Sequence, residues 1–482
     1  MPSLDFEPLT YAELPEDRRP SFGQALLPVL ATILFLAVGS AWLGMDPHMP
    51  LLWAIVFTGL VGYYLLGLSW EELYGGIADS LLMGLQAVFI LFAIYALIAT
   101  WISSGTIPGL MYYGLKLLSP SIFLPVTAIL SGLVAFSIGS SWTTVGTLGV
   151  AFIGIGSGLG IPAPMTAGAI LSGAYAGDKQ SPLSDTTNLA AAVTNTKLYD
   201  HIRAMRNGTV LAFGLAVVGY AILGLRASGS AQGGRVGDIQ HALLGTYHIS
   251  PLVFIPLVVT FGLALRGYPA LPSLVAGIFS GVGTAILVQG MSFTAAWDVV
   301  LAGTAPKTGM DLVNGLLQSG GIEGSAWTIS VVVAALTLGG LLETTGVLAV
   351  LAHRLSQSVS SVGGLIAGTG AAAMLTNALT AQQYMSIVVP GMTLRNLYDE
   401  YGLDSSNLSQ AVESAGTPTG ALIPWHAGAI YMAGALGVST VSYAPYYLFG
   451  FLSPIILFAM AATGKGIATD SSEKQGAVAS AD

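Results

Sequence analysis

Cysteine is absent from the 482 residues of this chain, and charged side chains make up only 8% of them. The lack of cysteine excludes disulfide frameworks, thiolate metal sites and cysteine nucleophiles. The scarcity of charged residues argues against a soluble protein, because soluble globular proteins carry about 25% charged residues. A water-soluble fold of this length could not cover its surface with so few charges. We therefore expect the chain to lie in a membrane.

Several functional classes are excluded by what is missing. The net charge of −9 is scattered and forms no basic stripe, so nucleic acid is not an expected partner. The first 20 residues are polar and mixed in sign, which argues against a cleaved signal peptide. Neither HExxH nor GxSxG in a strand–turn–helix context occurs, so we do not expect an intramembrane hydrolase or any other enzyme. No cofactor is expected.

Apolar residues are abundant, at 54% of the chain, and the mean hydropathy is +0.75. Segments long enough to cross the hydrocarbon core recur along the sequence. They lie at about 22–43, 50–68, 80–103, 120–139, 145–160, 163–177, 207–225, 250–265, 270–290, 325–342, 362–377, 384–396, 420–438 and 444–463. This pattern predicts an all-α polytopic protein of the cell membrane, with the lipid bilayer as its surroundings.

Polar stretches divide the chain. We predict a cytoplasmic N-terminal segment over 1–21, because Arg18 and Arg19 precede the first apolar stretch. A first transmembrane half over 22–226, with a broken helix at 163–193, is followed by a Gly- and Ser-rich linker at 227–249. The second transmembrane half covers 250–464. Residues 465–482 are polar and predict a disordered tail.

An internal repeat relates the two halves. Residues Pro50, Phe57 and Gly59 recur 222 positions later as Pro272, Phe279 and Gly281. Further on, Ser104-Gly105 matches Thr345-Gly346 at an offset of 241, which places an insertion near 304–324. Polar interruptions then coincide: we predict breaks at 140–144 and 177–188, matched by breaks at 377–383 and 413–420. Paired broken helices in two inverted halves, here about 50–200 and 272–440, indicate a transporter site near the bilayer midplane.

The segment 177–188 (GDKQSPLSDTTN) is the most polar of these interruptions. Pro182 lacks an N–H group and clashes with the preceding turn, so a helix cannot pass through undisturbed. Unwound backbone at membrane depth is tolerated where it is buried in protein or lines a wet cavity. The alternative is an ordinary hydrophilic loop between spans, although such a loop has no need of this density of Ser, Thr and acids.

Carboxylates, hydroxyls and carbonyls are the hard oxygen ligands that a small cation prefers. The predicted ion-binding residues are Asp178, Asp185, Ser181, Ser184, Thr186, Thr187, Asn188, Asn377 and Glu413, with Na⁺ itself at Asp185, Asp178, Thr186 and Asn188. Lys179 would balance the charge of the empty, deprotonated site. An acid inside the membrane is a functional candidate by default. The alternative for Glu413 is a helix-end acid in water.

Other polar and aromatic residues in the apolar segments allow plainer roles. Ser140 and Ser141 can satisfy the backbone of a kinked helix as readily as they can bind an ion. Trp142 fits packing or the membrane interface better than chemistry. His426 is a lone histidine on an apolar run, for which a hydrogen-bonded structural role and a proton relay both remain open.

The run GDKQSPLSDTTNLAAAV at 177–193, followed by Asp200-His201-Ile202-Arg203, resembles the signature of NhaC-type sodium/proton antiporters of the ion transporter superfamily. The likeness extends over about 22–463. It implies two inverted repeats with broken helices and re-entrant hairpins, an elevator-like movement, and a homodimer as the assembly to test. The group also includes exchangers of malate for lactate, so the motif indicates the family and not the cargo.

The sequence thus predicts a secondary sodium/proton antiporter. A desolvated carboxylate can hold a proton or Na⁺ but not both, so competition at Asp178 and Asp185 would couple the two ions. The alternative is a Na⁺- or H⁺-coupled organic-anion exchanger, whose substrate would need helix N-termini and a fixed cation. Lys179 offers one such charge, and no second one is evident for a dicarboxylate.

Overall fold

The computed structural model describes residues 9, 11, 13–16, 18–227, 233–357 and 359–468, almost all of them in helices or short turns. The first half contains α1 (Phe22–Leu36), η1 (Ala37–Trp42), α2 (His48–Leu60), η2 (Val61–Leu65), α3 (Trp70–Ser103), α4 (Thr106–Leu117), α5 (Pro120–Ile138), α6 (Ser141–Thr144), η3 (Val145–Gly149), α7 (Val150–Gly158), α8 (Ala163–Asp178), α9 (Asp185–Val193) and α10 (Leu198–Ala227). The predicted tail at 465–482 falls outside the described residues from 469 onward.

The remaining helices follow in the same manner. They are α11 (Gly233–Thr246), η5 (Pro251–Phe254), α12 (Ile255–Leu265), α13 (Ala270–Leu287), α14 (Phe293–Ala302), α15 (Asp311–Leu316), α16 (Gly321–Gly324), α17 (Ala326–Thr344), α18 (Val347–Gln357), α19 (Val362–Thr380), α20 (Gln383–Thr393), α21 (Arg395–Glu400), α22 (Ser405–Gly420), α23 (Ala427–Leu436), α24 (Thr440–Tyr443), η6 (Ala444–Tyr446) and α25 (Leu448–Thr463). Helix α11 lies within the predicted linker, so part of that segment is helical.

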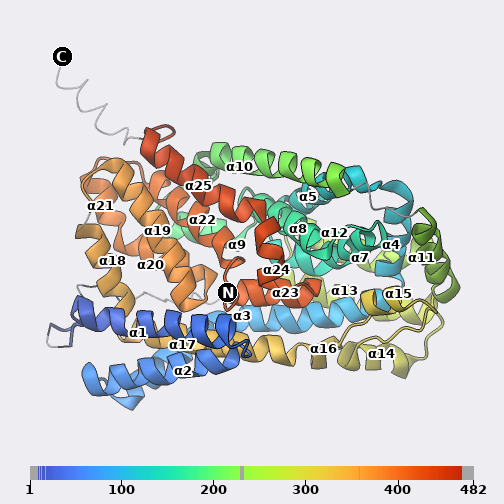
Figure 1. The fold of residues 1–482 in the computed structure, drawn as a ribbon, viewed down its shortest axis with the longest axis horizontal. Helices are drawn as coiled ribbons and strands as arrows, with labels where there is room; N and C mark the ends of the chain where they lie inside the picture. Colours follow the sequence, from blue (N-terminus) through green and yellow to red (C-terminus); the bar gives the residue numbers. More distant parts are fainter. Residues whose placement is uncertain are drawn as a thin grey trace.

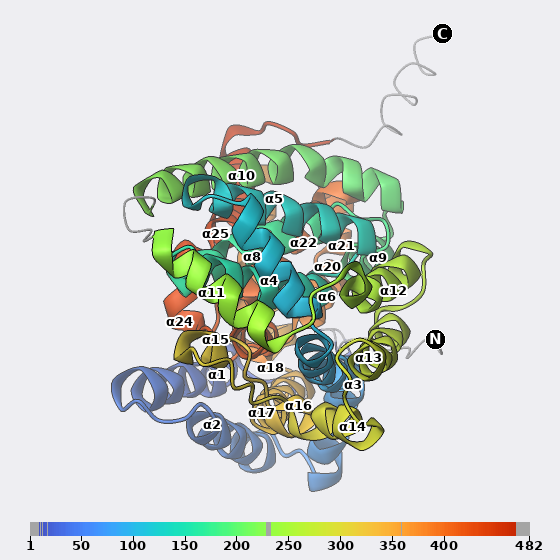
Figure 2. The same cartoon turned by 90° about the vertical axis from the view of Figure 1, so that its right-hand side faces the viewer.

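The helices form two layers with further helices between them, among them α8, α19 and α22 (Figure 1). Helices α1, α2, α3 and α17 run along one side, and α5, α10 and α25 run along the other. Figure 2, turned by 90°, shows the same separation. Eight described helices are long and apolar enough to cross a membrane, and up to ten if each bent pair counts as one span. The prediction of an all-α polytopic membrane protein is confirmed.

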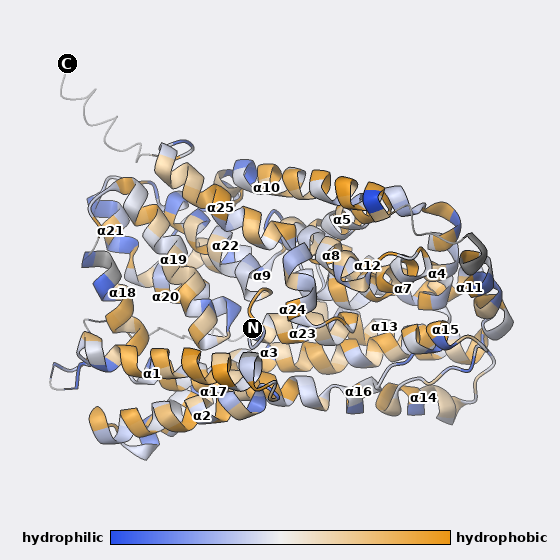
Figure 3. Ribbon diagram, viewed as in Figure 1, coloured by the Kyte–Doolittle hydropathy of each residue, from blue (hydrophilic) through white to orange (hydrophobic). Residues whose placement is uncertain are grey.

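The outer surface of these layers is apolar (Figure 3). On α1, α2 and α10, Leu30, Val56 and Val218 are 57%, 59% and 57% exposed. Side chains of this kind are stable in contact with acyl chains and would be costly in contact with water. The long faces of the molecule are therefore the surfaces that face lipid.

Two helices begin earlier than the hydropathy predicts. Ser69 and Glu72 form a capping box, in which the Ser69 N–H donates to Glu72 Oε2 at 2.7 Å and the Glu72 N–H donates to Ser69 Oγ at 3.2 Å. This cap satisfies orphan N–H groups and starts α3 at Trp70. The 34-residue helix thus begins before the predicted apolar segment 80–103. Similarly, α10 begins at Leu198, before the predicted apolar segment 207–225.

The predicted repeat is confirmed by the order of the helices. From α5 onward, corresponding helices begin 242 residues apart, one more than the predicted offset: α5 and α19 at 120 and 362, α6 and α20 at 141 and 383, α8 and α22 at 163 and 405, α9 and α23 at 185 and 427. The segment between α14 and α17, with α15, α16 and a bridge pairing Thr304 with Ser319, coincides with the predicted insertion.

Each half contains two helix breaks near the middle of the molecule. At the first break of each half, a residue in the left-handed region precedes an extended residue. These are Gly139 (φ +67°) before Ser140, and Ala381 (φ +55°) before Gln382. The second pair lies at 179–184 and 421–426. The predicted breaks at 140–144, 177–188 and 377–383 are close to these positions.

The predicted break at 413–420 is wrong. Helix α22 runs unbroken from Ser405 to Gly420, with Pro418 inside it, and the chain unwinds only after it. Proline removes the N–H that would bond to the carbonyl four residues earlier, here Ser414. That carbonyl instead accepts a hydrogen bond from Ser453 Oγ of α25 at 2.7 Å. A side chain from another helix thus replaces the missing donor, so α22 can continue.

Candidate functional site

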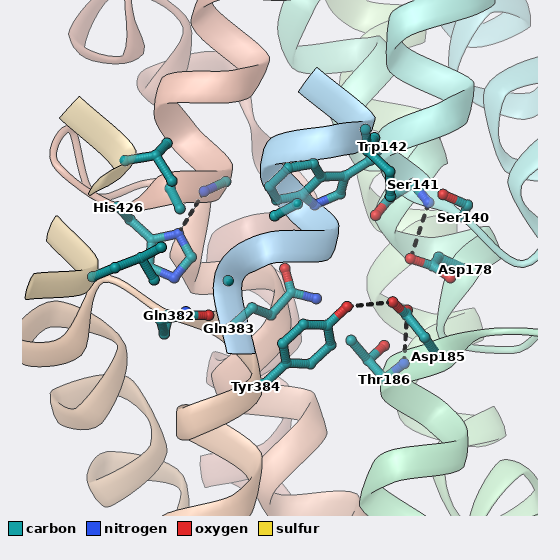
Figure 4. Close-up of a pocket in the computed structure, with 17 residues that line it drawn as sticks. Ser140, Ser141, Trp142, Asp178, Asp185, Thr186, Gln382, Gln383, Tyr384 and His426 are labelled. Carbon is teal, nitrogen blue, oxygen red and sulfur yellow. Dashed lines mark hydrogen bonds between the residues drawn. The ribbon is translucent and has the colours of Figure 1, made fainter. Parts of the chain in front are cut away.

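A small cavity of about 60 Å³ lies where the broken helices of the two halves meet (Figure 4). It is lined by Gly84, Ala87, Ile90, Ser140, Ser141, Trp142, Asp178, Asp185, Thr186, Val332, Leu336, Gln382, Gln383, Tyr384, His426, Ala427 and Gly428. Most of the polar groups come from the helix breaks, because those are the places where the backbone and polar side chains are not committed to a regular helix. The apolar wall comes from α3 and α17.

Asp178 is the last residue of α8 and is 4% exposed. Its Oδ2 accepts a hydrogen bond from the backbone N–H of Ser141, at the start of α6, at 3.0 Å. Its Oδ1 has no hydrogen-bond partner in the described part of the chain. An unpaired carboxylate oxygen buried beside a cavity costs free energy unless a ligand or water meets it. The arrangement marks Oδ1 as a point of ligand contact.

Asp185 is the first residue of α9, which Ser184 caps. Its Oδ1 accepts from the Thr186 N–H at 2.8 Å, and its Oδ2 accepts from the Tyr384 hydroxyl of α20 at 2.6 Å. A carboxylate in the first turn of a helix is stabilised by the N-terminal end of the helix dipole. The second half of the chain therefore helps to hold the acid of the first half in place.

Glu413 lies behind α9 and does not line the cavity. Its Oε1 accepts from Thr186 Oγ1 and Thr187 Oγ1 at 3.1 and 3.2 Å, and its Oε2 contacts His201 Nε2 at 2.7 Å. Both Glu413 and His201 are completely buried. Because Thr186 touches both the cavity and Glu413, this buried pair is connected to the site through one side chain.

Lys179 is buried but turned away from the cavity. Its Nζ donates to the backbone carbonyl of Glu413 at 3.0 Å and to Ser453 Oγ at 3.3 Å. The ammonium therefore ties the 179–184 break to α22 and α25. Among the residues that line the cavity there is no Lys or Arg. The site is acidic, with two carboxylates and no fixed cation facing them.

His426 and Asn377 form a separate hydrogen-bonded group. His426 Nδ1 accepts from the Gly428 N–H at 2.9 Å, which leaves Nε2 to donate to Asn377 Oδ1 at 3.1 Å. The Asn377 amide donates to Thr419 Oγ1 at 3.2 Å and to the Gly416 carbonyl. Both ring nitrogens of His426 are thus engaged within the protein, which fits the structural role rather than the relay.

The structure brings three of the predicted ion ligands to the cavity wall: Asp178, Asp185 and Thr186. The others lie behind it or beside it. Asn188 caps its own loop through bonds to the carbonyls of Pro182 and Ser184, at 2.9 and 2.7 Å. Ser181 Oγ accepts from the Leu183 N–H at 3.2 Å, and Ser184 Oγ caps α9. These residues shape the loop that presents the two acids.

Sequence reasoning missed Gln382, Gln383, Tyr384 and His201. The available signal was the internal repeat, because at an offset of 242 residues Ser140 and Ser141 correspond to Gln382 and Gln383. The described residues contain no group of three or more His, Asp or Glu side chains arranged to hold a metal ion. Trp142 stacks on Tyr431 with ring centroids 4.5 Å apart, as expected of a packing residue.

The sequence profile of the Na⁺/H⁺ antiporter family matches residues 21–178 and 173–465, nearly the whole transmembrane region. The chain belongs to the Na⁺/H⁺ antiporter family. This confirms the resemblance carried by the 177–193 segment. With its apolar helices, it also confirms a multi-pass protein of the cell membrane. The cavity and its two acids are therefore the candidate transport site of an antiporter.

Relatives within the Na⁺/H⁺ antiporter family are named for different cargoes. The chain is 55% identical to the arginine/ornithine antiporter ArcD of Halobacterium salinarum, over 96% of each chain. It is 36% identical to the Na⁺/H⁺ antiporter NhaC of Alkalihalophilus pseudofirmus, over 95% of this chain and 98% of the relative. It is 38% identical to the malate-2H⁺/Na⁺-lactate antiporter of Bacillus subtilis, over 83% and 86%. Membership of the family does not by itself decide the cargo.

Proposed function

We propose that this antiporter exchanges cationic amino acids, arginine on one side of the membrane for ornithine on the other. The observation that carries the proposal is the charge of the cavity. Asp178 and Asp185 line it, and no Lys or Arg does. A guanidinium or ammonium group pairs with such carboxylates through charge-assisted hydrogen bonds, the strongest kind available to side chains.

The lining of the cavity supports an organic substrate. Pockets for small organic ligands combine an apolar lining with a few placed polar groups. Here Ile90, Val332 and Leu336 line the cavity together with the two acids. The methylene chain of arginine or ornithine would contact that wall. The relative named as an arginine/ornithine antiporter, at 55% identity over 96% of both chains, supports the same assignment.

Sodium/proton exchange is the second candidate, favoured by the hydroxyls that surround the acids. Ser140, Ser141 and Thr186 line the cavity together with the two carboxylates, a set of hard oxygens that suits a small cation. Competition between Na⁺ and H⁺ at these acids would weaken the apparent Na⁺ affinity by up to about tenfold per pH unit per proton. Exchange of malate or lactate has less support, because an organic anion would face two acids and no fixed cation.

Flux in sealed vesicles distinguishes these functions. Purified protein is reconstituted into proteoliposomes loaded with ornithine, and the uptake of labelled arginine is followed. We expect uptake that requires internal ornithine and is unaffected by malate on either side. Parallel vesicles containing a pH-sensitive dye receive NaCl without amino acids. Proton release on adding Na⁺, with no arginine uptake, would replace the proposal with the second candidate.

A further inference from the structure

Four buried polar atoms on the cavity wall have no hydrogen-bond partner among the described residues. Two lie beside the acids, Asp178 Oδ1 and Ser141 Oγ. The other two belong to adjacent glutamines of the second half, Gln382 Nε2 and Gln383 Oε1. These glutamines are 5% and 9% exposed. Leaving a buried polar group unpaired is costly, so their concentration at one cavity indicates a place where a ligand or ordered water binds.

The two sides of the cavity differ in chemistry although they derive from one repeat. At the offset of 242 residues, Ser140 and Ser141 correspond to Gln382 and Gln383, as the starts of α6 and α20 show. By the same offset, the positions of the acids Asp178 and Asp185 are occupied by Gly420 and Ala427 in the second half. Figure 4 shows the acids on one side and Gln382 with His426 on the other. The acidic side has no acidic counterpart opposite.

The glutamine side also offers backbone donors. Helix α20 has 11 residues and begins at Gln383, and its N-cap Gln382 makes no side-chain capping bond. The first N–H groups of a helix have no partner within it, and together with the helix dipole they attract an anionic group. The free Gln382 amide, buried at the same point, adds a side-chain donor. His426 does not compete, because both of its ring nitrogens are engaged.

We infer that Gln382, with the N-terminus of α20, binds the α-carboxylate of the transported amino acid and so selects amino acids over the corresponding amines. Gln383 Oε1, the neighbouring acceptor, is placed to receive the α-ammonium group. One donor and one acceptor from consecutive residues complement the two charges of the amino-acid head group. The cationic side chain then reaches Asp178 and Asp185 across the cavity. This inference rests on the proposed exchange of cationic amino acids.

The test compares arginine with agmatine, which has the same guanidinium and methylene chain but no carboxylate. Ornithine-loaded proteoliposomes take up labelled arginine in competition with increasing agmatine. The variants are Gln382→Leu, which removes the donor, and Gln382→Glu, which places a negative charge at the same point. Gln240→Leu is the matched control, because Gln240 of α11 donates to the Tyr112 carbonyl away from the cavity.

For the wild type and Gln240→Leu we expect arginine to be preferred over agmatine. Gln382→Leu is expected to reduce that preference by about tenfold to a hundredfold, the range for losing a hydrogen bond to a charged group. Gln382→Glu is expected to reverse it, because the new carboxylate repels the α-carboxylate and attracts amines. The ratio of two substrates does not depend on how much variant protein reaches the membrane.

The role of Gln382 and the proposed exchange of arginine for ornithine are tested by different outcomes. If the wild type exchanges arginine for ornithine but Gln382→Leu and Gln382→Glu keep the wild-type preference, the assignment of Gln382 is overturned and the proposed function stands. If the wild type takes up no arginine from ornithine-loaded vesicles, the proposed function itself fails. A reversed preference in Gln382→Glu supports both.

Discussion

At the scale of single residues, the two cavity acids have different partners and therefore different expected roles. Asp178 keeps one oxygen unpaired, whereas both oxygens of Asp185 are held by Thr186 and Tyr384. Asp178 is thus free to meet the cargo directly. Asp185 contributes charge from a fixed position at the start of α9.

Asp185→Asn is expected to weaken arginine binding strongly while leaving a folded protein. The amide keeps the shape and can still accept the Tyr384 hydroxyl, but it supplies no charge for a cationic cargo. Losing a charge-assisted bond costs about 1.5–3 kcal/mol, or roughly tenfold to more than a hundredfold in affinity. The measurement is ornithine-driven arginine uptake as a function of arginine concentration.

Asn188→Ala is the matched control for that experiment. Asn188 lies three residues further along α9, in the same signature segment, yet bonds only within its own loop. We expect its uptake to stay near that of the wild type. Loss of uptake in Asn188→Ala together with full activity in Asp185→Asn would move the site from the acids to the loop.

The buried pair of Glu413 and His201 is expected to contribute to stability. Removing one partner of a fully buried pair leaves the other uncompensated and costs about 3–5 kcal/mol. Glu413→Ala should therefore lower the thermal unfolding temperature in detergent strongly, and Glu413→Ala with His201→Leu by less than the sum of the single changes. Strictly additive effects would show that the two side chains do not act as a pair.

How much of the site could be predicted from the sequence depended on how far apart the contacting residues lie along the chain. Asp178 and Asp185 stand out because acids are rare in apolar segments, and both line the cavity. The contact of Tyr384 with Asp185 joins residues 199 positions apart, and no local pattern signals it. His201 meets Glu413 across 212 positions in the same way. Lys179 was predicted to balance the charge of the two acids, and only the fold reveals that its ammonium points to α22 and away from the cavity.

At the scale of helices, contacts with residues distant in the sequence again explain why some helix ends were predicted at the wrong place. Pro418 is a sound local signal for a break, and α22 continues because Ser453 of α25 replaces the lost donor. The acidic start of α3 looks like a loop by hydropathy, and the Ser69–Glu72 capping box makes it a helix. Breaks at 139–140 and 381–382 were predictable, because Gly, Ser and Gln interrupt apolar runs there.

The close contact of α5 with α8 positions Asp178. A Cβ atom at Gly173 or Gly177 would lie 2.0 Å from the carbonyl oxygen of Ala128 or Gly132, respectively. Small residues allow helix backbones to approach in membranes, and here no side chain fits. We expect Gly177→Ala to push α8 away from α5, lower the unfolding temperature and reduce exchange, because Asp178 is the next residue.

Gly214→Ala in α10 is the matched control for this change. A Cβ atom at Gly214 would meet no atom within 4 Å. Alanine favours a helix over glycine by about 1 kcal/mol, so this variant should be as stable as the wild type or slightly more stable. Equal effects of both substitutions would show that helix propensity, and not the α5–α8 contact, determines the outcome.

At the scale of the whole molecule, the cavity lies between two halves that each contribute one side of it. Its acids come from the first half, and its uncapped helix α20 comes from the second. The repeat was visible in the sequence because polar interruptions kept their order through both halves. The chemical difference between the two sides of the cavity was not visible in the sequence, because it depends on which residues face each other in the fold.

This arrangement predicts obligatory, electroneutral exchange. Two carboxylates without a bound cation are costly to move through the low-dielectric centre of the membrane, so the empty carrier should not change sides. Arginine and ornithine each carry one net positive charge, and a one-for-one exchange moves no net charge. We therefore expect no arginine uptake into vesicles that lack internal substrate, and an unchanged rate in ornithine-loaded vesicles when a potassium diffusion potential is imposed with valinomycin. Uptake into empty vesicles, accelerated by a negative interior, would show instead that the empty carrier returns and that the acids are neutralised by protons during that step.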